Sequence, residues 1–304
     1  MKISTNLFFD RASQQIVNGQ QKLARSQMQL ATGKQIVNPS DAPEKASTLQ
    51  RLRTALEQQQ SYRSNLDTLT ERLENQNTAL QSVSSMLTRM RELAIQYGNG
   101  TLGAEQRRVA AIEVRGIRDQ MLALANSRDT NGLTLFGGSR VAVDAFNTSG
   151  VYQGDQTSNE VPVGTSQAVL NRRGGDDIFR AVVRLDEQGE ETSVGFFEVI
   201  DNLALALEAN DAPAVLDRID EITEIHQGIA LSLADVGSDL NVVESQQSVI
   251  DEQLLRLKSV QSDLQDLDYA EAVSRMQKEM LGLEAAQSSF AQISRLSLFN
   301  YIGN

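Results

Sequence analysis

Cysteine and tryptophan are absent from the 304-residue sequence, histidine occurs once and proline only four times. Without cysteine the chain has no disulfide, no thiolate metal site and no thiol nucleophile. A single histidine provides one imidazole base and excludes a metal site built from several histidines. These absences remove the side chains on which most metal centres and many catalytic sites depend.

Basic residues are also scarce relative to acidic ones, 28 against 40, which gives a formal net charge of −12. This balance argues against a general nucleic-acid binder, because such binding depends on neutralising phosphates. No apolar run approaches the roughly 20 residues that cross a bilayer. The first thirty residues lack the sustained apolar segment of a cleavable signal peptide, so we expect a protein that stays in the cytosol or is exported without cleavage.

What the sequence does contain is a seven-residue repeat of apolar positions over residues 52–97. Steps of three and four alternate without a break, and twelve of the fourteen positions are apolar or aromatic. The pattern predicts one long helix in a coiled coil, in preference to an ordinary amphipathic core helix. Such a helix rises roughly 70 Å, so we expect an elongated molecule. The positions are Leu52, Ala55, Gln59, Tyr62, Leu66, Leu69, Leu73, Gln76, Leu80, Val83, Leu87, Met90, Ala94 and Tyr97.

Turn-forming residues bound this helix. Asn38–Pro43 predicts a turn in which Ser40 or Asp41 caps the helix that follows. The glycines of Gly98–Gly100 end the helix. A second helix is predicted over residues 104–127, running back along the first.

Both ends of the chain also predict amphipathic helices, over roughly the first forty residues and within residues 249–302. Residues 1–63 carry nine basic and four acidic side chains, whereas residues 201–272 carry three basic and sixteen acidic ones. Exposed ion pairs contribute only about 0–1 kcal/mol each, so burial of apolar surface must dominate any pairing of the ends.

Glycine-rich sequence separates the two helical flanks. The residues from about 141 to 197 contain short β-branched runs between glycines, which predict a small β lobe. The predicted strands include Val161–Val163, Ala181–Leu185 and Val194–Phe197.

Few residues suggest chemistry. His226 lies inside helical sequence, where a lone histidine is more typical of a surface or partly buried position than of a catalytic one. Gly174–Asp177 is more typical of a tight turn than of a calcium or nucleotide loop, and the sequence has no phosphate-binding glycine-lysine loop. We therefore predict no catalytic residue, no metal and no cofactor. The remaining classes are a self-assembling structural subunit, a cytosolic coiled-coil adaptor and, third, an enzyme.

Short segments spread over both flanks carry a resemblance to a known family. They are Ile3–Asn6, Thr32–Lys34 with Asn38–Pro43, Arg91–Ala94 with Asn99–Thr101, Asn131–Gly132 with Leu135–Gly138, and Leu296–Ile302. These segments resemble the bacterial flagellins, the axial proteins of the flagellum. Within that family Tyr152–Asp155, Gly174–Phe179 and Asp235–Asn241 resemble the hook-associated members, and filament flagellin is the alternative.

The resemblance implies a mainly α fold with a small β insertion, an elongated coiled-coil helical bundle with a middle β lobe. Residues 1–43 and 260–304 would pair as the inner coiled coil of a tube. Residues 44–140 and 198–259 would form a helical rod, and residues 141–197 an outer β-rich domain.

The implied function is that of a structural subunit, not an enzyme, at the extracellular junction between hook and filament. Its partners would be further copies of itself in a ring, hook-associated protein 1, the flagellin filament, a cytosolic flagellar export chaperone and the type III export apparatus. Neither nucleic acid nor a membrane is an expected partner.

We expect the assembly interface on the apolar stripes of the terminal helices, since a lone amphipathic helix cannot bury its own stripe. The expected interface residues are Ile3, Asn6, Ile16, Leu23, Leu30, Met276, Met280, Leu283, Phe290, Ile293, Leu296, Leu298, Phe299 and Ile302.

Overall fold

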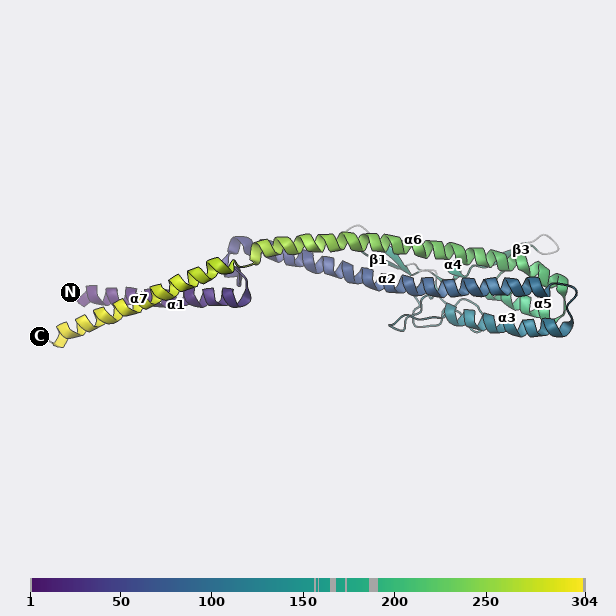
Figure 1. The fold of residues 1–304 in the computed structure, drawn as a ribbon, viewed down its shortest axis with the longest axis horizontal. Coiled ribbons are helices and arrows are strands. Elements are labelled where there is room, and N and C mark those ends of the chain that lie inside the picture. Colours follow the sequence, from purple (N-terminus) through teal and green to yellow (C-terminus); the bar gives the residue numbers. More distant parts are fainter. Residues whose placement is uncertain are drawn as a thin grey trace. The chain divides into compact units, whose positions relative to one another are not determined.

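The computed structural model of the chain describes residues 2–155, 157, 159–164, 168–172, 174–185 and 191–302. Helices dominate these residues (Figure 1). They are α1 (Lys2–Thr32), the 3-10 turn η1 (Pro39–Asp41), α2 (Pro43–Tyr97), α3 (Ala104–Ala125), α4 (Gly175–Ile178), α5 (Phe196–Glu208), α6 (Ala212–Gln265) and α7 (Tyr269–Ile302). The prediction of a mainly α fold with a small β insertion is confirmed.

The strands form two separate antiparallel hairpins. Strand β1 (Asn159–Pro162) pairs with β2 (Ala168–Arg172), and β3 (Val182–Leu185) pairs with β4 (Glu191–Val194). Each hairpin needs a helical surface to bury its apolar side, because an isolated two-stranded hairpin is marginal in water. Val163, which follows β1, and Val169 of β2 are buried, as are Val182 and Val194 of the second hairpin.

Contacts divide the chain into two units, residues 1–58 with 253–304, here called the terminal unit, and residues 59–252, here called the central unit. The predicted division into inner, rod and outer domains concerns layers of an assembly and stays a prediction.

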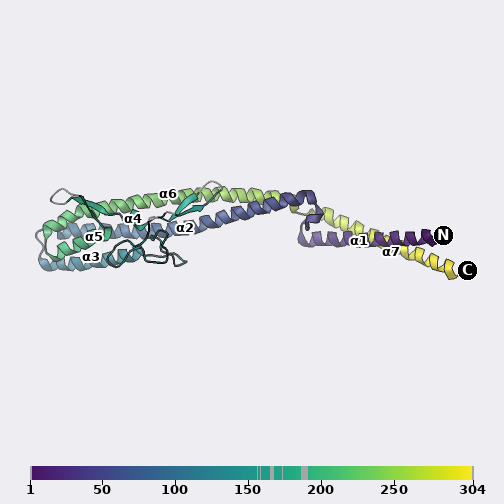
Figure 2. The same cartoon turned by 180° about the vertical axis from the view of Figure 1, so that it is seen from behind.

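Helices α2 and α6 lie side by side in the central unit (Figures 1 and 2). The predicted heptad positions of α2 in this unit contribute to its core, and eight apolar ones among them are at most 2% exposed. They are Leu66, Leu69, Leu73, Leu80, Val83, Leu87, Met90 and Ala94. Helix α6 has its own buried positions at three- and four-residue spacing, including Ile222, Ile225 and Ile229. The prediction of a long helix paired with a partner helix is confirmed.

Two polar residues of α2 are buried because the loop after α3 binds them. Gln76 occupies a heptad position and donates from Nε2 to the carbonyl oxygen of Leu135 at 3.1 Å. Arg72 donates from Nη2 to the carbonyl oxygens of Thr134 and Leu135 at 2.8 and 3.0 Å, and its Nη1 lies 3.3 Å from the Asp129 carboxylate. These bonds satisfy buried groups that would otherwise destabilise the core.

Two local predictions are wrong. The strand predicted over Val194–Phe197 ends at Val194, and α5 begins at Phe196. Gly195 adopts the extended conformation of an N-cap, and its N–H donates to the Glu198 carboxylate at 3.4 Å, which starts the helix instead. Helix α2 begins at Pro43, so Ala42 occupies its N-cap position and neither Ser40 nor Asp41 lies there. The Asp41 carboxylate has other partners. It accepts from the preceding N–H groups of Val37 and Asn38.

The helical sequence over 249–302 belongs to two helices. Helix α6 ends at Gln265, and α7 begins at Tyr269. The Asp268 carboxylate accepts hydrogen bonds from the N–H groups of Ala270 and Glu271, at 2.9 and 3.1 Å, and so caps α7. In the described part of the chain, none of the helices combines the length and apolar composition that crossing a bilayer requires.

Candidate assembly interface

The terminal unit pairs helices from opposite ends of the sequence. Helix α1 packs against α7. The rings of Phe9 and Phe290 meet edge to face, with centroids 5.5 Å apart. A Cβ placed on Gly19 would lie 3.3 Å from Cδ1 of Leu283, so glycine allows a close approach of the two helices. Apolar contacts therefore join the first helix to the last, and Gly19 allows the two helices to approach closely.

Two backbone hydrogen bonds, here called the clasp, join the residues that follow α1 to the residues between the end of α6 and the start of α7. The N–H of Leu267 donates to the carbonyl oxygen of Gly33 at 3.0 Å, and the N–H of Gln35 donates to that of Gln265 at 2.7 Å. Gly33 has a φ of 67°, and a Cβ there would lie 2.7 Å from the hydroxyl oxygen of Tyr269. The clasp thus requires glycine at position 33, both for its backbone conformation and for space.

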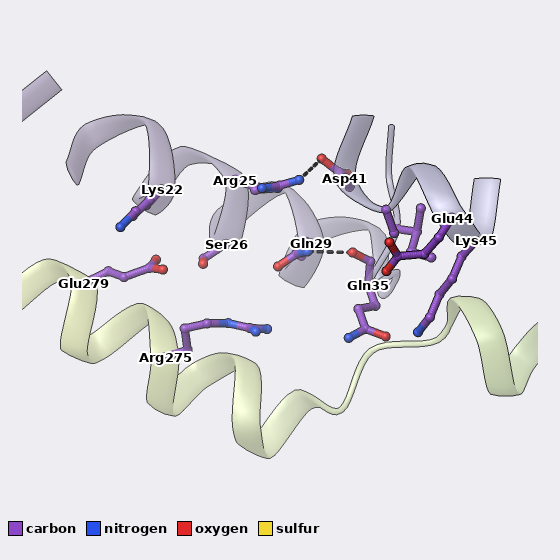
Figure 3. A pocket seen from close by; sticks show the side chains of 12 residues that line it. Lys22, Arg25, Ser26, Gln29, Gln35, Asp41, Glu44, Lys45, Arg275 and Glu279 are labelled. Atoms are coloured by element: carbon purple, nitrogen blue, oxygen red, sulfur yellow. Dashed lines mark hydrogen bonds and ion pairs between the residues drawn. The ribbon is translucent and has the colours of Figure 1, made fainter. Parts of the chain in front are cut away.

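Side chains tie the turn after α1 back onto α1 (Figure 3). The Asp41 carboxylate accepts from the N–H of Asn38 at 2.8 Å and from that of Val37 at 3.1 Å, and it pairs with the guanidinium of Arg25. The hydrogen bond from Asn38, with further help from Arg25, holds the pKa of Asp41 below its ordinary value. Gln29 donates from Nε2 to the carbonyl oxygen of Gln35 at 2.6 Å.

The same elements enclose a polar cavity of about 490 Å³. In Figure 3 Lys22 and Arg25 come from α1, and Arg275 and Glu279 come from α7. Acidic, basic and amide side chains line this cavity, and it therefore provides a polar contact region between the helices.

The structure describes the side chains of seven expected interface residues. Met280 is 43% exposed. Ile16, Leu23, Leu30, Met276, Leu283 and Phe290 are partly buried. The other seven lie in α1 and α7, but their side chains fall outside the described part; they are Ile3, Asn6, Ile293, Leu296, Leu298, Phe299 and Ile302. The role of all fourteen in assembly stays a prediction.

A second apolar face of α1 was not predicted. Val17 and Met28 are 41% and 54% exposed, and Ala24 and Ala31 are exposed on the same side of the helix. These four positions, here called the outer stripe, are spaced by seven, four and three residues, and this spacing is the signal that the sequence offered. On α7, Leu281 is 66% exposed.

Two positions that the sequence analysis considered for chemistry, His226 and Gly174, lie in the central unit. Nε2 of His226 lies 2.9 Å from Oγ of Ser84, a hydrogen bond that joins α6 to α2. Gly174 is the N-cap of the short helix α4. Among the residues that the structure describes, no group of three or more histidine or acidic side chains is placed to hold a metal ion.

Two models of known protein families match the chain. The family model described as the bacterial flagellin N-terminal helical region matches residues 3–140. The model of the bacterial flagellin C-terminal helical region matches residues 219–302. The two matches contain both terminal helices and most of the central unit.

Individual relatives align over nearly the whole chain. Flagellar hook-associated protein 3 of Escherichia coli K12 is 28% identical over 98% of this chain and 99% of its own length. A flagellin of Listeria innocua is 21% identical over 97% of this chain and 96% of its own. The crystal structure of flagellar hook-associated protein 3 from Legionella pneumophila superposes with a TM-score of 0.62, at 18% identity, over 71% of this chain and 98% of that one.

Proposed function

Because the chain belongs to the bacterial flagellin family, we propose that it is a structural subunit of the flagellum, a hook-associated protein that joins the hook to the flagellin filament. The subunit works by assembly and not by catalysis. It assembles with further copies of itself through its terminal helices.

The observation that carries this proposal is the state of the terminal unit. One face of helix α1 packs against α7, yet Val17 and Met28 of the outer stripe and Leu281 of α7 remain exposed. Fully burying an exposed side chain of this kind contributes about 1.5–3 kcal/mol, and because these three are 41–66% exposed, burying each of them stabilises an assembly by roughly half of that. Because every copy carries the same faces, repeated contacts between copies generate a ring or tube.

Placement at the junction, in preference to the filament, rests on the relatives. Identity to the relative named flagellar hook-associated protein 3 is higher than identity to the relative named flagellin, over similar coverage. The proposed partners are therefore hook-associated protein 1 on the hook side and flagellin on the other. Before assembly, a cytosolic chaperone covers the apolar terminal helices, and the type III export apparatus carries the chain out of the cell without cleavage.

Location tests this proposal. Gold-labelled antibodies against residues 141–197 should mark a single site at the base of each filament in electron micrographs. Label along the whole filament would assign the chain to the filament instead, and label confined to the cytoplasm would contradict a flagellar role altogether.

A further inference from the structure

The solvent-facing side of helix α3 in the central unit carries an apolar ridge. Val109 and Ile112 are 57% and 67% exposed, and Gly116 is exposed one turn later on the same side. The opposite side of α3 is buried in the unit through residues that include Val114 and Met121. Because a surface helix normally turns its polar side to water, Val109, Ile112 and Gly116, here called the α3 ridge, form a candidate contact surface.

Gly116 adds to this interpretation. Among the described residues, and apart from its own helix, no atom lies within 4 Å of a Cβ built at this position. Packing inside the subunit therefore does not require glycine there, although glycine inside a helix is less stable than alanine. Its small size lets the backbone of another helix come close to the α3 ridge.

Helix α6 presents an acidic face on the outside of the same unit. Asp217, Asp220 and Glu224 are exposed and follow one another at steps of three and four residues, so they share one side of the helix. Leu216 lies beside them and is 49% exposed. This side is opposite the buried Ile222. The three carboxylates and Leu216 are here called the α6 face.

Contacts with α2 place the α3 ridge and the α6 face at the same height. Oγ of Ser84 lies 2.9 Å from Nε2 of His226 in α6, and Nε of Arg89 donates to the carboxylate of Glu113 in α3 at 2.9 Å. Both helices run antiparallel to α2, so Glu221, five residues before His226, is level with Glu113. The α3 ridge surrounds position 113 and the α6 face surrounds position 221.

The two surfaces lie on opposite sides of the central unit. Ser84 and Arg89 are five residues apart in α2, so their side chains point about 140° apart around that helix. Figures 1 and 2 show α6 and α3 on either side of α2 in both views. One copy therefore cannot bring its own α3 ridge onto its own α6 face. Two copies side by side in the same orientation bring the ridge of one to the face of the other.

The charges of the two surfaces are complementary. Arg108 borders the α3 ridge, is exposed and has no ion-pair partner among the residues that the structure describes. The carboxylate of Glu113 beside the ridge is engaged by Arg89 at 2.8 Å, and Glu105 lies in the first turn of α3, where the helix dipole favours an acidic side chain. The three carboxylates of the α6 face also lack an ion-pair partner in the described part of the chain.

We propose that the α3 ridge of one copy docks against the α6 face of a second copy. Val109 and Ile112 cover Leu216, and Arg108 pairs with Asp217. The contact is heterologous, because it joins two different surfaces, and its repetition leads from copy to copy around a ring. It lies outside the terminal helices, and only its place in a ring rests on the function proposed above.

Disulfide trapping tests this contact in the purified full-length chain, which has no cysteine of its own. One chain carries Ile112→Cys, and a second chain, labelled with ¹⁵N, carries Asp220→Cys. The two are mixed and oxidised, and mass spectrometry separates the mixed dimer from the two like dimers. We expect several times more of the mixed dimer than of the two like dimers together, whereas random collision gives equal amounts.

A random mixture of dimers would overturn the proposal, and so would an excess of the dimer joined through two copies of Ile112→Cys, which indicates a symmetric contact. Thr78→Cys, at an exposed position of α2, replaces Asp220→Cys as the control and should give the random mixture. The test uses no flagellum, so its result and that of the antibody labelling can fail separately.

Charge reversal locates the contact. Arg108→Glu in the Ile112→Cys chain should lower the yield of mixed dimer about fivefold, because it brings like charges together. Adding Asp217→Arg to the other chain should restore part of the yield, which a folding defect would not allow. Arg53→Glu reverses another exposed arginine, in the terminal unit, and should leave the yield unchanged. If Arg53→Glu lowered the yield as much as Arg108→Glu, the effect would be one of net charge and the assignment would be wrong.

Discussion

Phe9 and Phe290 lie near opposite ends of the chain, yet their rings meet edge to face at 5.5 Å within the terminal unit. This contact couples the first helix to the last. An edge-to-face pair contributes about 0.5–1.5 kcal/mol beyond the area it buries.

Phe290→Ala should loosen the terminal unit without unfolding the central one. We expect faster amide hydrogen exchange in α1 and α7 and unchanged exchange in the central-unit parts of α2 and α6, residues 59–97 and 212–252, measured by mass spectrometry. Ser288→Ala on the exposed side of α7 is the matched control and should exchange like the parent. If the amides of α1 exchanged as slowly in the Phe290→Ala variant as in the parent, the ring contact would not be what holds the helices together.

Gly33→Ala should open the clasp, because alanine in the left-handed region costs about 1–2 kcal/mol and its Cβ would meet the Tyr269 hydroxyl. The amide of Gln35, which donates to Gln265, should lose protection against exchange. Adding Tyr269→Phe removes the clash and should restore only part of this protection, since the backbone strain remains. Gly116→Ala is the control: no other group lies within 4 Å of its added Cβ, and helix stability should rise by about 0.5–1 kcal/mol.

Acid should weaken the turn held by Asp41. Because the folded-state pKa of Asp41 is lowered, the folded turn binds fewer protons than the unfolded one, and its stability falls as the pH drops below about 4. Proton exchange at the N–H groups of Val37 and Asn38, followed by NMR between pH 6 and 3, should show this loss. Asp41→Asn should show weaker protection at pH 6 and almost no further change on acidification. A parent-like pH profile in that variant would assign the loss to other groups.

Leu73→Pro should disrupt α2, because an interior proline costs roughly 3 kcal/mol or more and Leu73 is only 2% exposed. We expect a clear fall in helicity by circular dichroism and a lower melting temperature. Thr78→Ala, at an exposed position of the same helix, should melt like the parent. Unchanged helicity in Leu73→Pro would contradict the assignment of a continuous helix through Leu73.

Periodicity predicts the long helices well because burial follows it directly. Leu66, Leu69 and Leu73 are buried where the heptad pattern places them. The pattern says nothing of polar exceptions such as Gln76, because its partner is a carbonyl in a loop that is distant in sequence. Short apolar runs are ambiguous between strand and helix, and in Val194–Phe197 the cap at Gly195 decides the outcome.

The candidate interface was less accessible to sequence reasoning. Ile16, Leu23 and Leu30 stand out as one stripe, but an amphipathic pattern does not say whether its partner is another part of the chain or another molecule. The structure shows α7 packed on α1, which leaves the outer stripe with Val17 and Met28 as the exposed apolar face of α1.

The most direct test of the account is assembly of Met28→Glu beside Gln27→Glu. Both positions are exposed in α1 and both variants gain one negative charge, but only Met28 belongs to the outer stripe. In cells that lack the parent chain, we predict that Gln27→Glu restores attached filaments, whereas Met28→Glu does not, although its purified monomer melts like the parent. Normal filaments with Met28→Glu would contradict the claim that this face exists to be covered by another subunit.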